Sequence, residues 1–102
     1  MSESATPYQV EYSGRVRQEL RSLAARAIER GDGEAFVASL REFHRRLCIY
    51  PQFGDPLIDL THEPGQICIG ILRPLSMRYG LYELRRLVLV VDSPVLLPMS
   101  LE

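Results

Sequence analysis

The fold is decided by two helical patterns in residues 13–51, which read SGRVRQELRSLAARAIERGDGEAFVASLREFHRRLCIYP. In the first pattern, apolar residues recur at the spacing of one helical face, at Val16, Leu20, Leu23, Ala24, Ala27 and Ile28. Ser13 precedes this pattern as a favourable N-cap, and Gly31 follows it where a helix end favours a left-handed residue. The pattern therefore predicts an α-helix that begins after Ser13 and ends at Gly31.

The second pattern begins at Asp32, which is expected to cap another helix, with Glu34 favoured in its first turn by the helix dipole. Its apolar residues repeat at helical spacing, at Phe36, Leu40, Phe43 and Leu47. Pro51 cannot continue the helix and biases Tyr50 towards an extended conformation. Because only Gly31 and its neighbours separate the two helices, we expect a tight antiparallel hairpin.

Alternating apolar residues predict strands on both sides of this hairpin. Before it, residues 8–12 alternate between Tyr or Val and a polar residue. After it, the expected strands are 57–60, 67–72, 77–82 and 86–91, with a brief further pairing at 95–97. In the third of these, Met77, Tyr79 and Leu81 share one face, whereas Arg78, Gly80 and Tyr82 share the other. The residues 83–85 predict a turn, and the run 86–91 predicts a central strand covered on both faces.

This order of elements predicts an α+β domain of the form β-α-α-β-β-β. Its N-terminal strand is followed by an antiparallel helical hairpin that packs on one face of a small antiparallel sheet. A chain of 102 residues has room for one such domain. We assign the domain to residues 8–98, with a flexible N-terminal segment at 1–7. Residues 99–102 form a tail, of which the last two residues could be a cloning remnant.

The composition is typical of a soluble globular protein, with 46% hydrophobic and 25% charged residues, and we expect a cytoplasmic location. The longest apolar run, 87–91, is too short to span a bilayer, and residues 1–7 lack the pattern of a secretion signal. Cys48 and Cys68 have no zinc-type spacing, so we interpret them as small buried hydrophobes in a reducing compartment. No pattern predicts a metal, a cofactor or a membrane partner.

All twelve basic residues are arginine, and the net charge of −1 argues against a surface that binds nucleic acid throughout. Arginine suits bidentate contacts to phosphate or carboxylate, although codon bias would produce the same composition. Arg15, Arg17 and Arg21 predict a solvated helix face, with contact to ribosomal RNA or to an acidic antitoxin segment as the alternative. His44 predicts a residue at the boundary of the core, with membership of a basic patch as its alternative.

The order of these elements, together with several of their sequences, resembles the RelE/ParE superfamily of bacterial type II toxins. The resemblance is carried by the opening strand YQVEYS (8–13), the arginine-rich first helix and the loop LCIYPQFGDPL (47–57). The strand RPLSMRY (73–79) and the hairpin into RLVLVV (86–91) complete it. The resemblance covers residues 8–97, which is nearly the whole domain.

This resemblance implies a sheet that cradles a concave, basic surface, and a cognate antitoxin that wraps the toxin and neutralises it. It also implies one of two targets. RelE-like members cleave messenger RNA on the ribosome, whereas ParE-like members bind and poison DNA gyrase. The RelE-like reaction uses arginines and lysines on the sheet, with a tyrosine or histidine near the C-terminal strand.

In this chain the matching candidates are Arg73, Arg78, Tyr82, Arg85 and Arg86. Arg78 and Tyr82 share a strand face and each lies two residues from Gly80, which leaves room for a phosphate between them. On this hypothesis Arg78 and Tyr82 are catalytic, and the other three arginines contact the target. The alternative is that Arg78 is a solvated arginine and Tyr82 a packed aromatic at the sheet edge.

The sequence departs from the RNase members after Arg86, because no lysine, arginine, histidine or tyrosine follows. Arginine keeps its proton up to a pKa above about 12 and is a poor general base. We therefore expect a toxin-like protein that acts by binding its target, in translation or at gyrase. The alternatives are a ribosome-dependent mRNA endoribonuclease and an inactive relative that serves as an interaction domain, with a homodimer formed by edge pairing.

Overall fold

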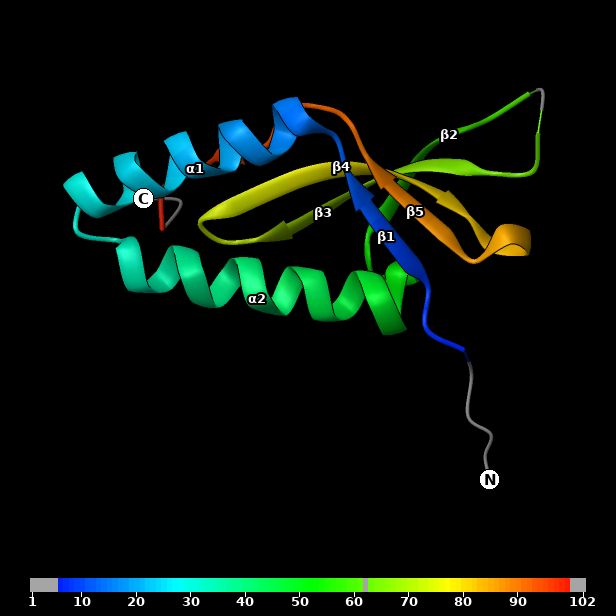
Figure 1. Ribbon diagram of the computed structural model, residues 1–102, viewed down its shortest axis with the longest axis horizontal. Coiled ribbons are helices and arrows are strands. Elements are labelled where there is room, and N and C mark those ends of the chain that lie inside the picture. Colours follow the sequence, from blue (N-terminus) through cyan, green and yellow to red (C-terminus); the bar gives the residue numbers. More distant parts are fainter. Residues whose placement is uncertain (1–5, 62, 100–102) are drawn as a thin grey trace.

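A computed structural model describes residues 6–61 and 63–99 (Figure 1), so the ends of the two predicted terminal segments lie outside the described residues. Helix α1 spans Gly14–Glu29 and begins after Ser13, whose hydroxyl accepts a hydrogen bond from the Val16 amide at 3.1 Å. Gly31 follows the helix with a left-handed φ of 87°. The predicted first helix is confirmed at both ends. No helix among the described residues is long and apolar enough to cross a membrane.

Helix α2 spans Gly33–Ile49 and runs back beside α1 (Figure 1). The expectation that the Asp32 side chain caps this helix is wrong, because its carboxylate instead pairs with Arg30 Nε at 2.7 Å. The helix ends where predicted, because Pro51 cannot continue it, and Tyr50 has a non-helical backbone with φ −152° and ψ 64°. A single 3₁₀ turn, η1, then spans Pro51–Phe53.

The six strands form one sheet, which confirms the α+β class and the predicted order of elements. They are β1 (Gln9–Tyr12), β2 (Asp55–Asp59), β3 (Gln66–Leu72), β4 (Leu75–Tyr82), β5 (Leu87–Val90) and β6 (Val95–Leu96). The order across the sheet is β1-β5-β4-β3-β2, with β6 on β4. The sheet is mixed rather than wholly antiparallel, because β1 pairs with β5 in parallel. Alternation along a strand reports its faces and carries no information about its direction.

The core lies between the helical hairpin and one face of the sheet. Met77, Tyr79 and Leu81 of β4 are almost fully buried in it, as the alternation predicted. Val88 and Val90 of β5 are fully buried on the same side. The opposite faces of these strands are only partly covered, so β5 is shielded on one face rather than on both.

Tyr79 joins the sheet to the turn that follows α2. Its hydroxyl donates a hydrogen bond to the Pro51 carbonyl and accepts one from the Gly54 amide at 3.1 Å. A Cβ atom at residue 54 would collide with this hydroxyl, so the close approach requires glycine. Burial raises the pKa of Tyr79 above its ordinary value. The phenol is therefore a neutral hydrogen-bonding partner that fixes where the chain leaves α2.

We predict that Tyr79→Phe lowers the free energy of unfolding by about 1–3 kcal/mol, because a buried carbonyl and an amide lose their partner. Urea denaturation at pH 7 measures this change. Tyr50→Phe is the matched control, because Tyr50 is 57% exposed. Equal stability of the two variants would contradict the assigned role of the Tyr79 hydroxyl.

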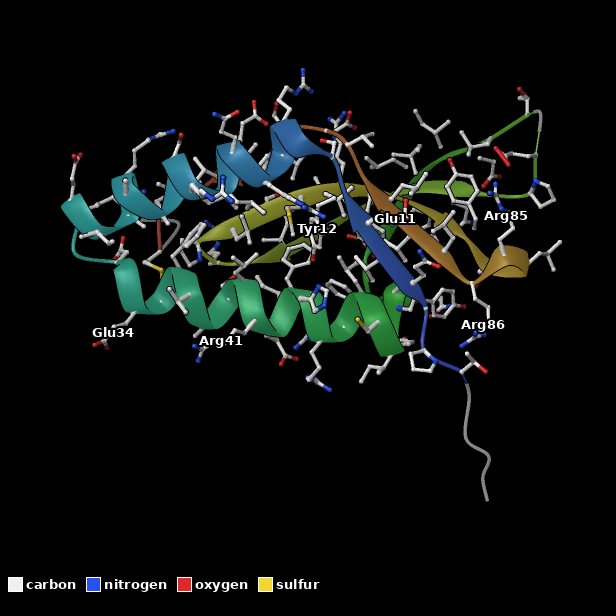
Figure 2. All side chains as sticks on the ribbon, viewed as in Figure 1. Glu11, Tyr12, Glu34, Arg41, Arg85 and Arg86 are labelled. Carbon is white, nitrogen blue, oxygen red and sulfur yellow. The ribbon has the colours of Figure 1, made fainter. Side chains whose placement is uncertain are left out.

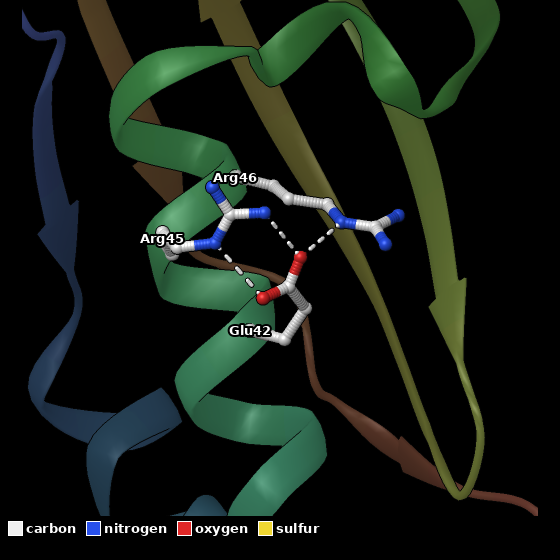
Figure 3. Close-up of polar contacts among 3 residues, drawn as sticks. All are labelled: Glu42, Arg45 and Arg46. Carbon is white, nitrogen blue, oxygen red and sulfur yellow. Dashed lines mark hydrogen bonds and ion pairs between the residues drawn. The ribbon is translucent and has the colours of Figure 1, made fainter.

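A three-residue ion cluster supports the same turn from α2 (Figure 3). The carboxylate of Glu42 pairs with Arg45 Nη2 at 2.6 Å and with Arg46 Nε at 2.7 Å. Arg46 in turn lies over the Phe53 ring, with 5.3 Å between its Cζ and the ring centroid. Hydrogen bonds from Arg45 and then Arg46 lower the pKa of Glu42 to about 2.

We predict that the Glu42 carboxyl titrates with a midpoint of about 2, which side-chain carbon NMR measures. Because this pKa is depressed, the stabilisation by Glu42 is complete above its ordinary pKa of 4.5 and is lost as the pH falls through 2. Glu42→Gln should thus destabilise the protein at pH 6 and have little effect near pH 2. A stability difference that does not change with pH would refute this assignment.

Candidate functional site

One face of the sheet is turned away from the helices and carries a mixed apolar and charged surface. In register across the strands, Glu11 of β1 lies beside Leu89 of β5, then Gly80 of β4 and Ile67 of β3. The next row brings Ile69 of β3 beside Arg78 of β4. We call this surface the open face. Its central strands supply aliphatic side chains, and Arg78 is its exposed cation on β4.

Arg78 shares a pocket of about 360 Å³ with Arg15 from the start of α1. The pocket is also lined by two hydroxyl groups, one carboxylate and two aliphatic side chains, those of Ser76, Ser93, Asp92, Ile69 and Val95. Within residues 6–61 and 63–99, neither arginine forms an ion pair. Two guanidinium groups against a single lining carboxylate make this pocket a candidate anion site.

Arg15 reaches the pocket because α1 starts at the end of β5. The Ser13 amide donates a hydrogen bond to the Val90 carbonyl at 3.0 Å, and Arg15 Nη2 donates a longer one to the Val91 carbonyl at 3.4 Å. From the sequence, Arg15 was expected on a solvated helix face, with contact to ribosomal RNA or to an acidic antitoxin segment as the alternative, and was not grouped with Arg78. No local pattern could pair it with Arg78, because the pairing depends on the parallel contact between β1 and β5.

Tyr82 does not line this pocket. Its ring lies against two glycines, so that a Cβ atom added at Gly80 would approach the ring to 3.0 Å and one added at Gly65 to 2.8 Å. The expectation of an open space above Gly80 is therefore wrong, because the aromatic ring fills it. The structure places Tyr82 as a half-buried packing residue at the edge of the open face.

The other three candidate arginines are separated from Arg78 and take part in contacts within the chain. Arg73 donates a hydrogen bond to the Pro98 carbonyl at 2.8 Å. Arg85 pairs with Glu63 at 3.4 Å and lies 5.9 Å from the centre of the Tyr82 ring.

Arg86 has a left-handed φ of 49°, so β5 begins one residue later than the predicted strand. Its guanidinium lies 4.3 Å from the centre of the Tyr8 ring, and it donates a hydrogen bond to the Thr6 carbonyl. In Figure 2, Arg85 and Arg86 project from the end of the sheet where the 3₁₀ turn η2 (Glu83–Arg85) precedes β5. The four candidate arginines thus do not form one cluster, and Arg78 is the only one of them that lines the pocket with Arg15.

A second group of polar side chains lies between β1 and α2. The Tyr12 hydroxyl is 2.8 Å from His44 Nδ1, and His44 Nε2 is 3.5 Å from Cys48 Sγ. Burial, with a smaller contribution from Cys48, raises the pKa of Tyr12 to about 12. Cys68 is buried as expected, whereas Cys48 is only partly so. Among the described residues, no group of three or more histidine, cysteine or acidic side chains could hold a metal ion.

The chemistry available in the Arg15–Arg78 pocket is that of anion recognition. Both arginines stay charged at physiological pH, so they can hold phosphate or carboxylate oxygens but cannot accept a proton. Asp92 is the one carboxylate among the residues that line the pocket. In comparisons with known proteins, the chain matches no family model, no curated protein and no solved structure.

Proposed function

We propose that this chain is a toxin-like component of a bacterial type II toxin–antitoxin module, and that it acts by binding a cellular target through the open face. The observation that carries the proposal is that Arg15 and Arg78 line one pocket on the open face, whose central strands supply aliphatic side chains. The resemblance to the RelE/ParE superfamily supplies the class of target, either the translation machinery or DNA gyrase. It also supplies the cognate antitoxin as the neutralising partner.

The surroundings of the pocket support a binding role. Ile71, Val91 and Val95 are each about half exposed, at 53%, 53% and 50%. Ile71 lies beside Ser76 on β3–β4, and Ser76 lies beside Val95 of β6, so two of these side chains flank the pocket. Exposed aliphatic side chains around a charged centre are typical of a surface that buries itself against a partner.

The endoribonuclease alternative assigns proton transfer to Tyr82, which the packing over Gly80 does not favour. A base inside the pocket would have to be Asp92, which the superfamily resemblance does not include. The remaining alternative, an inactive interaction domain, is supported by β2, because all five of its residues are exposed at the sheet edge. Binding of a target remains the function that the geometry supports best.

We predict that inducing the chain in a bacterial host arrests growth, and that the double variant Arg15→Ala, Arg78→Ala relieves the arrest. Each arginine contributes charge-assisted hydrogen bonds, so its loss should weaken target binding about tenfold or more. Arg26→Ala is the matched control, because Arg26 is exposed on α1 and does not line the pocket. Unimpaired growth with good soluble expression of the wild-type chain would count against the toxin proposal.

We predict that Tyr82→Phe leaves the arrest unchanged, because the ring that covers Gly80 is retained and only the hydroxyl is lost. Gyrase supercoiling and messenger RNA cleavage are measured in parallel in the arrested cells. Loss of both arrest and RNA cleavage in a Tyr82→Phe variant that still folds would replace the binding proposal with the endoribonuclease alternative.

A further inference from the structure

An apolar groove lies between α1 and α2, and we call it the hairpin groove. Its volume is about 570 Å³. Aliphatic and aromatic side chains from both helices form its floor, namely Leu20, Ala24, Phe36, Val37 and Leu40. The arginines along its rim can extend this apolar surface with their aliphatic stems while their charged ends stay in water. One end of the groove is lined by His44 of α2 and by Tyr12 of β1, which Figure 2 shows between the two helices. A ligand that matches this lining is largely apolar.

A thiol lies one helical turn beyond this end of the groove. Phe36, Leu40 and His44 line the groove from α2 at intervals of four residues. Cys48 is the next residue in the same row, and its Sγ lies 3.5 Å from His44 Nε2. Cys48 is only half-buried and His44 is exposed, so a reagent can reach both side chains from solution.

Cys48 and His44 have the arrangement of a nucleophile with an adjacent base. The second imidazole nitrogen, Nδ1, is 2.8 Å from the Tyr12 hydroxyl. In the tautomer with its proton on Nδ1, the imidazole donates to the phenol oxygen, and the Nε2 lone pair faces the thiol. His44 can then take the thiol proton, and the thiolate that forms is the nucleophilic species. Cys68 differs, because it is buried in the core and burial raises the pKa of its thiol.

The length of the hairpin groove indicates the size of the ligand. From Cys48 back to Val37, α2 rises about 16 Å at 1.5 Å per residue. An extended chain of about a dozen carbons spans this distance. A neighbouring hollow shares Val37 with the groove and continues to Ile28, so a chain of this length is not blocked at its far end. A nucleophile at one end of an apolar groove of this length matches a fatty acyl chain with an electrophilic carbonyl carbon.

We propose that Cys48 accepts an acyl group from an acyl thioester, and that the acyl chain then occupies the hairpin groove. The Cys48 sulfur attacks the carbonyl carbon of the donor, and the bond from this carbon to the donor sulfur breaks. The proton of the Cys48 thiol passes through His44 to the departing thiolate. The products are a thioester on Cys48 and a free donor thiol. The inference concerns a different surface from the open face and does not depend on the proposed function.

The test measures acylation of the full-length chain by intact-protein mass spectrometry. The donors are acetyl-coenzyme A and dodecanoyl-coenzyme A, each below the concentration at which the longer one forms micelles. We expect dodecanoyl transfer to be about tenfold or more faster than acetyl transfer, because only the longer chain gains from burial in the groove. Peptide mapping should place the acyl group on Cys48, and hydroxylamine should release it as it does a thioester. Cys48→Ser, which retains Cys68, should carry no thioester.

Two variants separate the groove from the nucleophile. Val37→Glu puts a charge on the groove lining and should slow dodecanoyl transfer about tenfold while leaving acetyl transfer unchanged. Val91→Glu is the matched control, because Val91 is also about half exposed, does not line the groove, and should react like the wild type. His44→Gln keeps a polar side chain but removes the base, so it should slow both donors about equally, by about tenfold or more.

Several results would overturn the inference. Absence of acylation, or equal rates with the two donors, would show that the groove does not hold an acyl chain. Acylation of Cys68 at the rate of Cys48 would show that His44 does not select the nucleophile, and so would unchanged rates in His44→Gln. Equal slowing by Val37→Glu and Val91→Glu would place the chain on another surface. Circular dichroism of each variant excludes loss of the helices as the cause.

Discussion

Parallel hydrogen bonding joins β1 to β5 from the pair Gln9–Leu87 to the pair Tyr12–Val90, and both surfaces of the molecule depend on it. On one side it sets the start of α1 at the end of β5, through the Ser13 amide and the Val90 carbonyl, and so brings Arg15 to Arg78. The same pairing also places Tyr12, at the end of β1, between the two helices and in contact with His44. One short strand thus fixes an anion pocket and the end of an apolar groove.

The elements of the fold and the antiparallel helical hairpin followed from local signals, whereas the direction of β1 in the sheet did not. Ser13, Gly31 and Pro51 act on neighbouring residues, so the helix ends could be predicted from the sequence, whereas the side chain of Asp32 was diverted by Arg30. Alternation gave the buried faces of β4 and β5 correctly. The direction of β1 was missed, because it depends on a contact between opposite ends of the domain that no sequence window contains.

The sequence predicted Arg78 as a site residue but not its surroundings, because these also depend on contacts between distant parts of the chain. The sequence shows that an arginine is a hydrogen-bond donor but not which acceptor it binds. The same side chain can bind an anion or donate to a backbone carbonyl. Arg73 and Arg86 hold carbonyl groups near the two ends of the described chain, whereas Arg78 faces an open pocket. Gly80 gave a similar ambiguity. A glycine on a strand leaves space above the sheet, and a neighbouring aromatic ring can occupy that space, as Tyr82 does here.

The pairing of β1 with β5 also has a kinetic consequence. The helical hairpin and the β3–β4 hairpin are built from contacts between residues near each other in the chain, and such contacts form early at low entropic cost. Joining Gln9 to Leu87 closes a loop that contains almost the whole domain, and loop-closure entropy grows with the length enclosed. We therefore expect β1 to dock late in folding. A nascent or partly folded chain would then possess its helices and hairpin but neither binding surface.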